Sequence, residues 1–229
     1  EVLANAGIER IYGITGDSLN SVNDSLRRNG KIAFEHVRHE ETAAFAAGAE
    51  ASLTGKLTVC AGSSGPGNLH LINGLFDCHR NRVPVLAIAS HIPQSEVGLN
   101  YFQETHPENL FKECSCFCEL ISNPKQMPEI LFRAMNAAVG NQDVAVIVLP
   151  GDVAVMETEI DELPVWHHPR LPHIVPQRED IEEMSAHLEK GERITLFCGA
   201  GCEGAHDEVV ELAKRLQAPV VHAFRGKEW

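Results

Sequence analysis

The sequence predicts an α/β fold: a doubly wound, mainly parallel six-stranded sheet, followed by the start of a second, Rossmann-like α/β domain. Three observations favour this class. Short apolar runs alternate with longer segments of helical period, which is the pattern of βα units. Glycines such as Gly30 and Gly55 stand where the helical segments end. A proline-rich stretch then divides the chain into two parts, each with α/β alternation.

Six strands are expected before residue 150. They fall at residues 11–15, 32–36, 57–61, 83–90, 114–121 and 144–149. Between them, Asp17 or Ser18 can cap one helix, an alanine-rich helix begins near His39, and Pro124 opens another whose apolar positions recur at helical spacing.

The domain organisation follows from the same pattern. Residues 1–155 form the first domain, residues 156–176 are a linker with four prolines and no sustained period, and residues 177–229 begin an incomplete second domain. The second domain opens with elements at 179–190, 194–198, 205–217 and 219–224. Because the chain lacks an initial Met and stops soon after a strand-like run, we expect an N-terminal fragment whose first helix is truncated.

Composition excludes several classes of protein. The 229 residues carry 19 Lys and Arg against 32 Asp and Glu, a net charge of −13, which disfavours nucleic-acid and anionic-membrane binding. The cysteines number seven, an odd count, and no leader sequence is evident, so we expect a cytoplasmic protein without a disulfide framework. The longest mostly apolar run, residues 83–90, is far shorter than the ~20 residues that a membrane span needs.

The first candidate site is the sequence RHEE at residues 38–41, which heads the alanine-rich helix. The simpler interpretation is a solvated glutamate favoured by the helix dipole. However, the alanines that follow would bury one carboxylate and leave its neighbour in water. A buried carboxyl group can share a proton with a ligand nitrogen.

Two loops after predicted strands are further candidates. GSSGPGN, at residues 62–68, is either a tight βα turn or a loop that lets a flat ligand approach the backbone; it is not a Walker loop, since no Gly-Lys-Ser/Thr follows. Tyr101, Phe102, Gln103 and Glu104 lie in a loop of ~16 residues, a length that is often functional. They are either exposed loop residues or contacts for a small polar substrate.

A glycine turn in the second domain has the spacing of a dinucleotide-binding motif, with Gly199, Gly201 and Gly204 between a strand and a helix. The acidic residue expected ~20 positions later is missing, and Arg225 stands there instead. This weakens an NAD assignment and leaves contact with another nucleotide cofactor open.

Two other groups are not taken as metal sites. Cys114, Cys116 and Cys118 alternate along one predicted strand, with no second pair at zinc-site spacing. The linker histidines, His167, His168 and His173, have no acidic partner or evident preorganised site.

The order of these motifs resembles the thiamine-diphosphate-dependent enzyme superfamily, over essentially the whole chain. It runs from RHEE through GSSGPGNLHLINGLFDCHRN and YFQETHP to VIVLPGDVA. Within it, GSSGPGNLHLINGLFDCHRNRVPVLAIASHIP and CGAGCEGAH look most like the oxidase branch, the bacterial quinone-linked pyruvate dehydrogenases, also called pyruvate oxidases. By this resemblance, the first domain is the pyrimidine-binding domain and the second begins the central FAD-binding domain.

The resemblance also implies roles for residues. Glu40 matches the glutamate that hydrogen-bonds N1′ of the aminopyrimidine and activates the cofactor, and Phe102 and Gln103 match a substrate-orienting pair. The remaining matches are cofactor contacts: Gly65, Pro66 and Gly67 at the pyrimidine pocket, and Gly199, Ala200 and Gly201 at FAD.

The implied reaction is oxidative decarboxylation of pyruvate to acetate and CO₂, with electrons passing through FAD to a quinone. The family is expected to act as a homo-oligomer, a dimer of dimers, in the cytoplasm, with a peripheral membrane contact through a C-terminal part. In this family, a further domain with a Gly-Asp-Gly motif holds Mg²⁺ and the diphosphate. Gly151-Asp152-Val153 does not match that motif. We therefore expect half a site and no activity from this chain alone. An acetolactate-synthase-like carboligase and a non-catalytic cofactor-binding module remain as alternatives.

Overall fold

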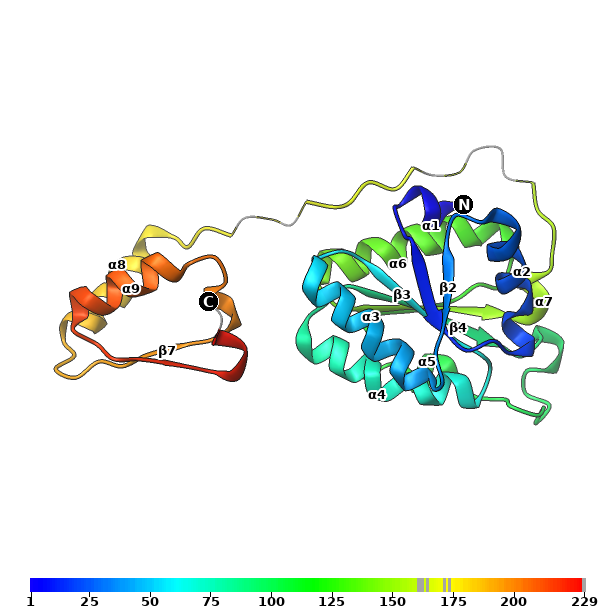
Figure 1. Ribbon diagram of the computed structural model, residues 1–229, viewed down its shortest axis with the longest axis horizontal. Helices are drawn as coiled ribbons and strands as arrows, with labels where there is room; N and C mark the ends of the chain where they lie inside the picture. Colours follow the sequence, from blue (N-terminus) through cyan, green and yellow to red (C-terminus); the bar gives the residue numbers. More distant parts are fainter. Residues whose placement is uncertain (160–162, 164, 171, 173, 228–229) are drawn as a thin grey trace. The chain divides into compact units, whose positions relative to one another are not determined.

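The structure is a computed structural model that describes residues 1–159, 163, 165–170, 172 and 174–227 (Figure 1). The chain divides into two compact units, Glu1–Leu171 and Pro172–Trp229. His173 and several other positions of the predicted linker lie outside the described residues.

Unit 1 contains a six-stranded sheet in which all strand pairs are parallel, in the order β2-β1-β3-β4-β6-β5. The strands are β1 (Arg10–Gly13), β2 (Ala33–His36), β3 (Thr58–Gly62), β4 (Val85–His91), β5 (Phe117–Leu120) and β6 (Val144–Pro150). The predicted fold class is confirmed.

β5 is much shorter than predicted. Residues 114–121 were expected to be extended, but β5 begins only at Phe117, because Cys114 lies in a turn whose N–H donates to the carbonyl of Phe111 at 3.2 Å. Cys114 is buried and Cys116 exposed. The three alternating cysteines therefore do not share one strand face.

Helices cover both faces of the sheet. The α-helices are α1 (Val2–Asn5), α2 (Asn20–Asn29), α3 (Glu40–Thr54), α4 (Pro66–Asn81), α5 (Pro107–Leu110), α6 (Met127–Asn141) and α7 (Gly151–Ala154), and the 3-10 helices are η1 (Asp17–Leu19), η2 (Gln94–Glu96) and η3 (Pro124–Gln126). Figure 1 shows α3 and α4 on one face and α6 on the other. Gly30 and Gly55 end α2 and α3 in the left-handed conformation, as predicted, with φ of 66° and 67°. Asp17 and Ser18 lie within η1 and do not cap α2.

The sheet separates two hydrophobic cores, and its central strands supply both. Alternate residues of β6 point to opposite faces. Ala145, Ile147 and Leu149 join the core beneath α6, whereas Val144, Val146 and Val148 join the core beneath α3 and α4. Every residue of β4 and β6 is buried, as expected for parallel strands covered on both faces.

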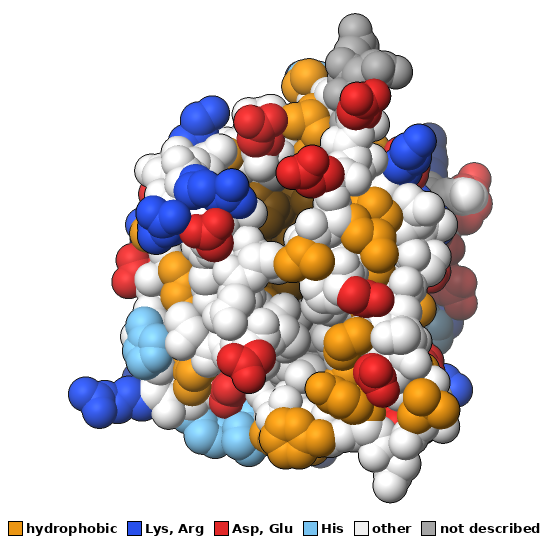
Figure 2. Space-filling model, turned by 90° about the vertical axis from the view of Figure 1, so that its right-hand side faces the viewer, with side chains coloured by type: hydrophobic (Ala, Val, Ile, Leu, Met, Phe, Trp, Pro, Cys, Tyr) orange, Lys and Arg blue, Asp and Glu red, His pale blue; other side chains and the backbone are white. Residues whose placement is uncertain are grey.

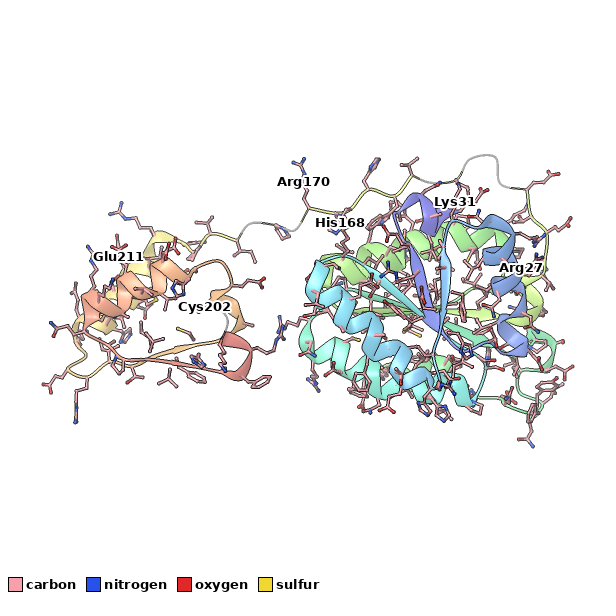
Figure 3. All side chains as sticks on the ribbon, in the orientation of Figure 1. Arg27, Lys31, His168, Arg170, Cys202 and Glu211 are labelled. Carbon is pink, nitrogen blue, oxygen red and sulfur yellow. The ribbon has the colours of Figure 1, made fainter. Side chains whose placement is uncertain are left out.

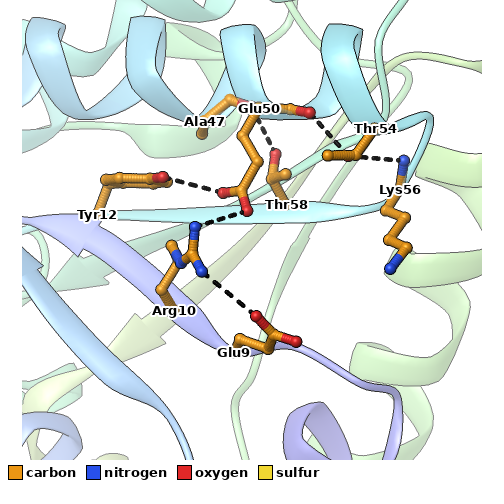
Figure 4. Close-up of polar contacts among 8 residues, drawn as sticks. All are labelled: Glu9, Arg10, Tyr12, Ala47, Glu50, Thr54, Lys56 and Thr58. Carbon is orange, nitrogen blue, oxygen red and sulfur yellow. Dashed lines mark hydrogen bonds and ion pairs between the residues drawn. The ribbon is translucent and has the colours of Figure 1, made fainter.

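A polar network fixes α3 against β1 (Figure 4). Glu50 of α3 accepts a hydrogen bond from the hydroxyl of Tyr12 at 3.0 Å and one from the guanidinium of Arg10 at 3.2 Å. The hydroxyl of Thr58 in β3 donates to the carbonyl of Ala47 at 2.8 Å. These contacts set the position of α3, and therefore of its first turn.

Unit 2 is a smaller βα arrangement. It consists of α8 (Arg178–Glu189), β7 (Leu196–Cys198), η4 (Ala200–Cys202), α9 (His206–Leu216), β8 (Val220–His222) and η5 (Phe224–Gly226). The two strands pair in parallel, Leu196 with Val220 through Cys198 with His222. Across the described part of the chain, no helix combines the length and apolar character that crossing a bilayer requires.

Candidate functional site

The strand order places a topological switch point beside β1, because β2 lies on one side of β1 and β3 on the other. Ligands of open parallel sheets bind at such a point, outside the carboxyl ends of the strands. In this chain, hydrogen bonds of serine residues join the segment after β1, the loop after β3 and the end of β4. The Ser18 and Ser63 hydroxyls lie 2.9 Å apart, the N–H of Ser64 donates to the Ser18 hydroxyl at 2.9 Å, and the Ser90 hydroxyl donates to the Ser18 carbonyl at 2.5 Å. Nothing in the sequence pattern singled out these serines together.

Glu40 is the first residue of α3, and only 8% of its surface is exposed. Ala43, Ala44 and Ala47 on the same helix are fully buried. The neighbouring Glu41 keeps 36% of its side chain exposed and accepts a hydrogen bond from Asn73 of α4. The sequence predicted one buried and one solvent-exposed carboxylate, and the structure identifies Glu40 as the buried one.

His70 of α4 is the hydrogen-bond partner of Glu40. His70 Nδ1 and Glu40 Oε2 are 3.0 Å apart and share one hydrogen bond, in which the ring donates when Nδ1 carries the proton. The ring of His39 stacks on that of His70, with centroids 4.4 Å apart, and His39 Nδ1 accepts the N–H of Glu41 at 3.3 Å. Sequence reasoning did not single out His70. The available signal was its position three residues after Gly67, on the same face of a helix.

His39, Glu40 and His70 form a group whose possible metal-binding atoms lie within 4.8 Å of one another. The two imidazole planes are inclined by only 25°. The in-plane lone pairs of stacked rings run side by side and do not converge on one ion at ~2.0 Å from each nitrogen. The site also lies at the positive end of a helix. We therefore assign no metal to this group.

The glycine loop between β3 and α4 closes the other side of the Glu40 carboxylate. Pro66 is the first residue of α4, and Gly65 before it has a φ of 65°. A Cβ added to Gly67 would stand 3.3 Å from Glu40 Oε1. The same Cβ would also stand 3.3 Å from Gly62 and Ser63, so glycine at position 67 lets the loop pack closely against the carboxylate.

The loop after β4 also contacts the glycine loop. An added Cβ at Gly65 would lie 2.8 Å from Cβ of Gln103 and 2.9 Å from its carbonyl oxygen. The hydroxyl of Ser64 donates to Gln103 Oε1 at 3.2 Å. The structure therefore places both Gln103 and Glu40 against residues 64–67, Gln103 at Ser64 and Gly65 and Glu40 at Gly67.

Phe102 is not packed into this group, since 77% of its surface is exposed. Val97, Leu99 and Tyr101 on the same loop are exposed as well. Figure 2 shows hydrophobic side chains gathered in the lower part of the face that it presents.

His91, the last residue of β4, is a buried titratable group near this loop. Only 5% of it is exposed, and its Nδ1 has no hydrogen-bond partner among the described residues. Burial lowers the pKa of His91, against the opposing influence of the carboxylates of Glu108 and Glu104.

Gly199, Ala200 and Gly201 belong to unit 2. Gly199 directly follows β7, and Ala200 and Gly201 form η4 together with Cys202 (labelled in Figure 3). A Cβ added to Gly199 or Gly201 would meet nothing within 4 Å. The packing of the described chain therefore does not require glycine at either position.

Comparison with known families agrees with this geometry. Residues 1–110 match the N-terminal TPP binding domain of the thiamine pyrophosphate enzymes, and residues 181–229 match their central domain. The two matches follow in that order along the chain and together cover more than half of it. The chain belongs to the thiamine pyrophosphate enzyme family.

Relatives extend the similarity over the whole chain. It is 59% identical over 230 residues to an uncharacterized 42.6 kDa protein in the isoamylase 3′ region of Pseudomonas amyloderamosa, covering 100% of this chain and 58% of that protein. It is 32% identical to a pyruvate oxidase of Lactiplantibacillus plantarum, covering 99% of this chain and 38% of the oxidase. It is also 32% identical to an acetolactate synthase of Arthrospira platensis, covering 96% of this chain and 40% of the synthase. The chain thus spans between about two fifths and three fifths of these relatives.

Proposed function

We propose that this chain supplies the aminopyrimidine side of a thiamine diphosphate site, in an enzyme that oxidatively decarboxylates pyruvate. The observation that carries the proposal is the Glu40 carboxylate, buried in the first turn of α3 and hydrogen-bonded to His70 at 3.0 Å. A carboxyl group in such a place can share a proton with a ring nitrogen. Oε1 of the same carboxylate lies against Gly67, so the backbone of the glycine loop comes close to the group that would meet the ring.

The chain's own residues would prepare the carboxylate for this role. The Nδ1–H of His70 fixes Oε2, while Oε1 faces Gly67. The buried alanines of α3 keep water away, so a hydrogen bond from Glu40 to a ring nitrogen is stronger than it would be in water. Bound thiamine diphosphate would supply the nucleophilic carbon that attacks the substrate carbonyl.

The remaining assignments extend the proposal outward from Glu40. Gln103, which packs against Gly65, hydrogen-bonds a small oxo acid through its amide. Phe102 of the same loop covers the substrate. The open space at Gly199 and Gly201 supports a flavin contact at that turn. We assign Mg²⁺ and the diphosphate to a domain outside these residues, since Gly151-Asp152-Val153 lacks the expected Gly-Asp-Gly pattern.

The proposed reaction converts pyruvate and water into acetate and CO₂, and two electrons pass through FAD to a quinone, which becomes a quinol. The motif resemblance to the oxidase branch supports this choice. We place the enzyme in the cytoplasm as a homo-oligomer, a dimer of dimers with a peripheral membrane contact. An acetolactate-synthase-like ligation of two pyruvates is the second candidate, because the acetolactate synthase relative has the same 32% identity as the oxidase relative.

The test uses the full-length product of the gene and the rate at which the C2 proton of thiamine diphosphate exchanges with solvent. Glu40→Gln should slow this exchange about 100- to 1,000-fold, because the proton-sharing carboxyl is lost. Glu41→Gln is the matched control: it removes the same charge from the same helical turn and should leave exchange within about twofold. Equal exchange in wild type and Glu40→Gln would refute the role of Glu40.

The products separate the two candidate reactions. With pyruvate and a quinone, the proposal expects acetate, CO₂ and flavin reduction that depends on pyruvate. Acetolactate without net flavin reduction would favour the ligase. Absence of both products in a protein that binds the cofactor would favour a non-catalytic module.

A further inference from the structure

The backbone of residues 98–104 adopts the left-handed conformation at three positions. Gly98, Asn100 and Gln103 all have positive φ, at 86°, 57° and 67°. Gly and Asn adopt this conformation readily, but it is unfavourable for the side chain of Gln103, so other contacts must stabilise it there.

Burial of apolar side chains does not hold the loop. The exposed fractions of Leu99, Tyr101 and Phe102 are 69%, 43% and 77%. A loop whose hydrophobic side chains face water has no core of its own to fix it.

One carboxylate supplies the missing support. Glu104 Oε1 accepts the N–H of Gly98 at 2.5 Å, and Oε2 accepts the N–H of Tyr101 at 3.2 Å. The N–H of Glu104 in turn donates to the carbonyl of Tyr101 at 2.9 Å. Hydrogen bonds to an ionised acceptor are stronger than neutral ones. The hydrogen bond from the Gly98 N–H accordingly lowers the pKa of Glu104.

The position of Gln103 depends on that loop shape. Gln103 directly precedes Glu104, and its Cβ and carbonyl oxygen lie where a side chain at Gly65 would be. Its Oε1 accepts from Ser64, on the glycine loop that also faces Glu40. A change in the shape of this loop would therefore move Gln103 relative to Ser64 and Gly65.

We propose that Glu104 is a positioning residue: by holding the backbone N–H groups of Gly98 and Tyr101, it sets Gln103 for contact with the substrate. This inference rests on the proposed function. Glu104 acts through the loop and need not touch the cofactor or the reacting atoms.

The experiment replaces Glu104 by Gln in the full-length product of the gene. The amide oxygen can accept from one of the two N–H groups, while the amide NH₂ opposes the other. Amide hydrogen exchange at Gly98 and Tyr101 should rise about tenfold at neutral pH, with the amides of β4 unchanged. The KM for pyruvate should rise about tenfold, while C2-proton exchange of thiamine diphosphate stays within about twofold of wild type.

Glu96→Gln is the matched control, since it removes the same charge from the same segment and leaves both hydrogen bonds in place. It should change neither amide exchange nor KM. If Glu104→Gln leaves the two amides as protected as in wild type, the inference is overturned. Faster amide exchange with an unchanged KM would also overturn it, because Glu104 would then be structural only.

Failure of the proposed function has a different signature. In that case the C2-proton exchange rate of thiamine diphosphate is the same in the wild type and in Glu40→Gln. Amide exchange at Gly98 and Tyr101 still reports whether Glu104 holds the loop.

Discussion

Replacing Gly74 by Ala should destabilise unit 1 through the contact between α3 and α4. A Cβ at position 74 would stand 2.5 Å from Cβ of Ala44, 2.9 Å from the carbonyl oxygen of Glu41 and 3.0 Å from the backbone nitrogen of Phe45. Two of these three atoms belong to the backbone of α3, so no side-chain rotation relieves the overlap. The two helices would have to separate.

The expected magnitude combines two opposing effects. Overpacking a well-packed interior costs about 1–3 kcal/mol, and backbone contacts place this substitution near the upper end. The higher helix propensity of Ala returns up to about 1 kcal/mol. We therefore expect the free energy of unfolding to fall by about 2 kcal/mol.

Gly140→Ala is the matched control in α6. It is the same chemical change in a helix, but an added Cβ there would meet nothing within 4 Å. We expect it to raise the free energy of unfolding by about 0.5–1 kcal/mol. Urea denaturation followed by far-UV circular dichroism compares the two, and unit 2 contributes equally to both. If Gly74→Ala were as stable as wild type, the close approach of α3 and α4 described above would be wrong.

Two further predictions concern buried titratable groups. Because burial lowers the pKa of His91 in the folded state, the unfolded chain takes up this proton first as the pH falls below about 6.5, and stability drops by at most about 1.4 kcal/mol per pH unit. Urea unfolding at pH 7.5 and pH 5 should show a smaller loss in His91→Gln; an equal loss in both proteins would contradict the assignment. Burial raises the pKa of Cys78 to about 12 and that of Cys114 to about 11, so at pH 8 iodoacetamide should modify exposed Cys116 before either. Peptide mass mapping of the native protein checks the order, and early labelling of Cys78 would argue against its burial.

The sequence predicted correctly those strands whose position is set by a local run of apolar residues. The apolar runs that became β4 and β6 are buried on both faces, so each reads as a continuous hydrophobic segment. The start of β5 was misplaced because Cys114 is apolar and buried, yet its backbone turns toward Phe111. Burial alone does not distinguish a strand from a packed turn.

The candidate site was predictable only in parts. Alanine-rich sequence after Glu40 indicated a buried carboxylate, and glycines at 65 and 67 indicated a close backbone approach. The partner of Glu40, His70, lies 30 residues away, and the contact of Gln103 with Gly65 joins two separate loops. Such pairs are set by how the helices and loops pack in three dimensions, which neither periodicity nor local composition contains.

The contact between Gly65 and Gln103 limits how this site can diverge in evolution. A larger residue at 65 collides with residue 103, and a β-branched residue at 103 is strained at its φ of 67°. Because the carbonyl oxygen and Cα of residue 103 belong to the backbone, no substitution at 103 makes room for a side chain at 65. Phe102, next to them and 77% exposed, carries no such restriction. Related sequences are therefore expected to vary at residue 102 and to keep glycine at residue 65.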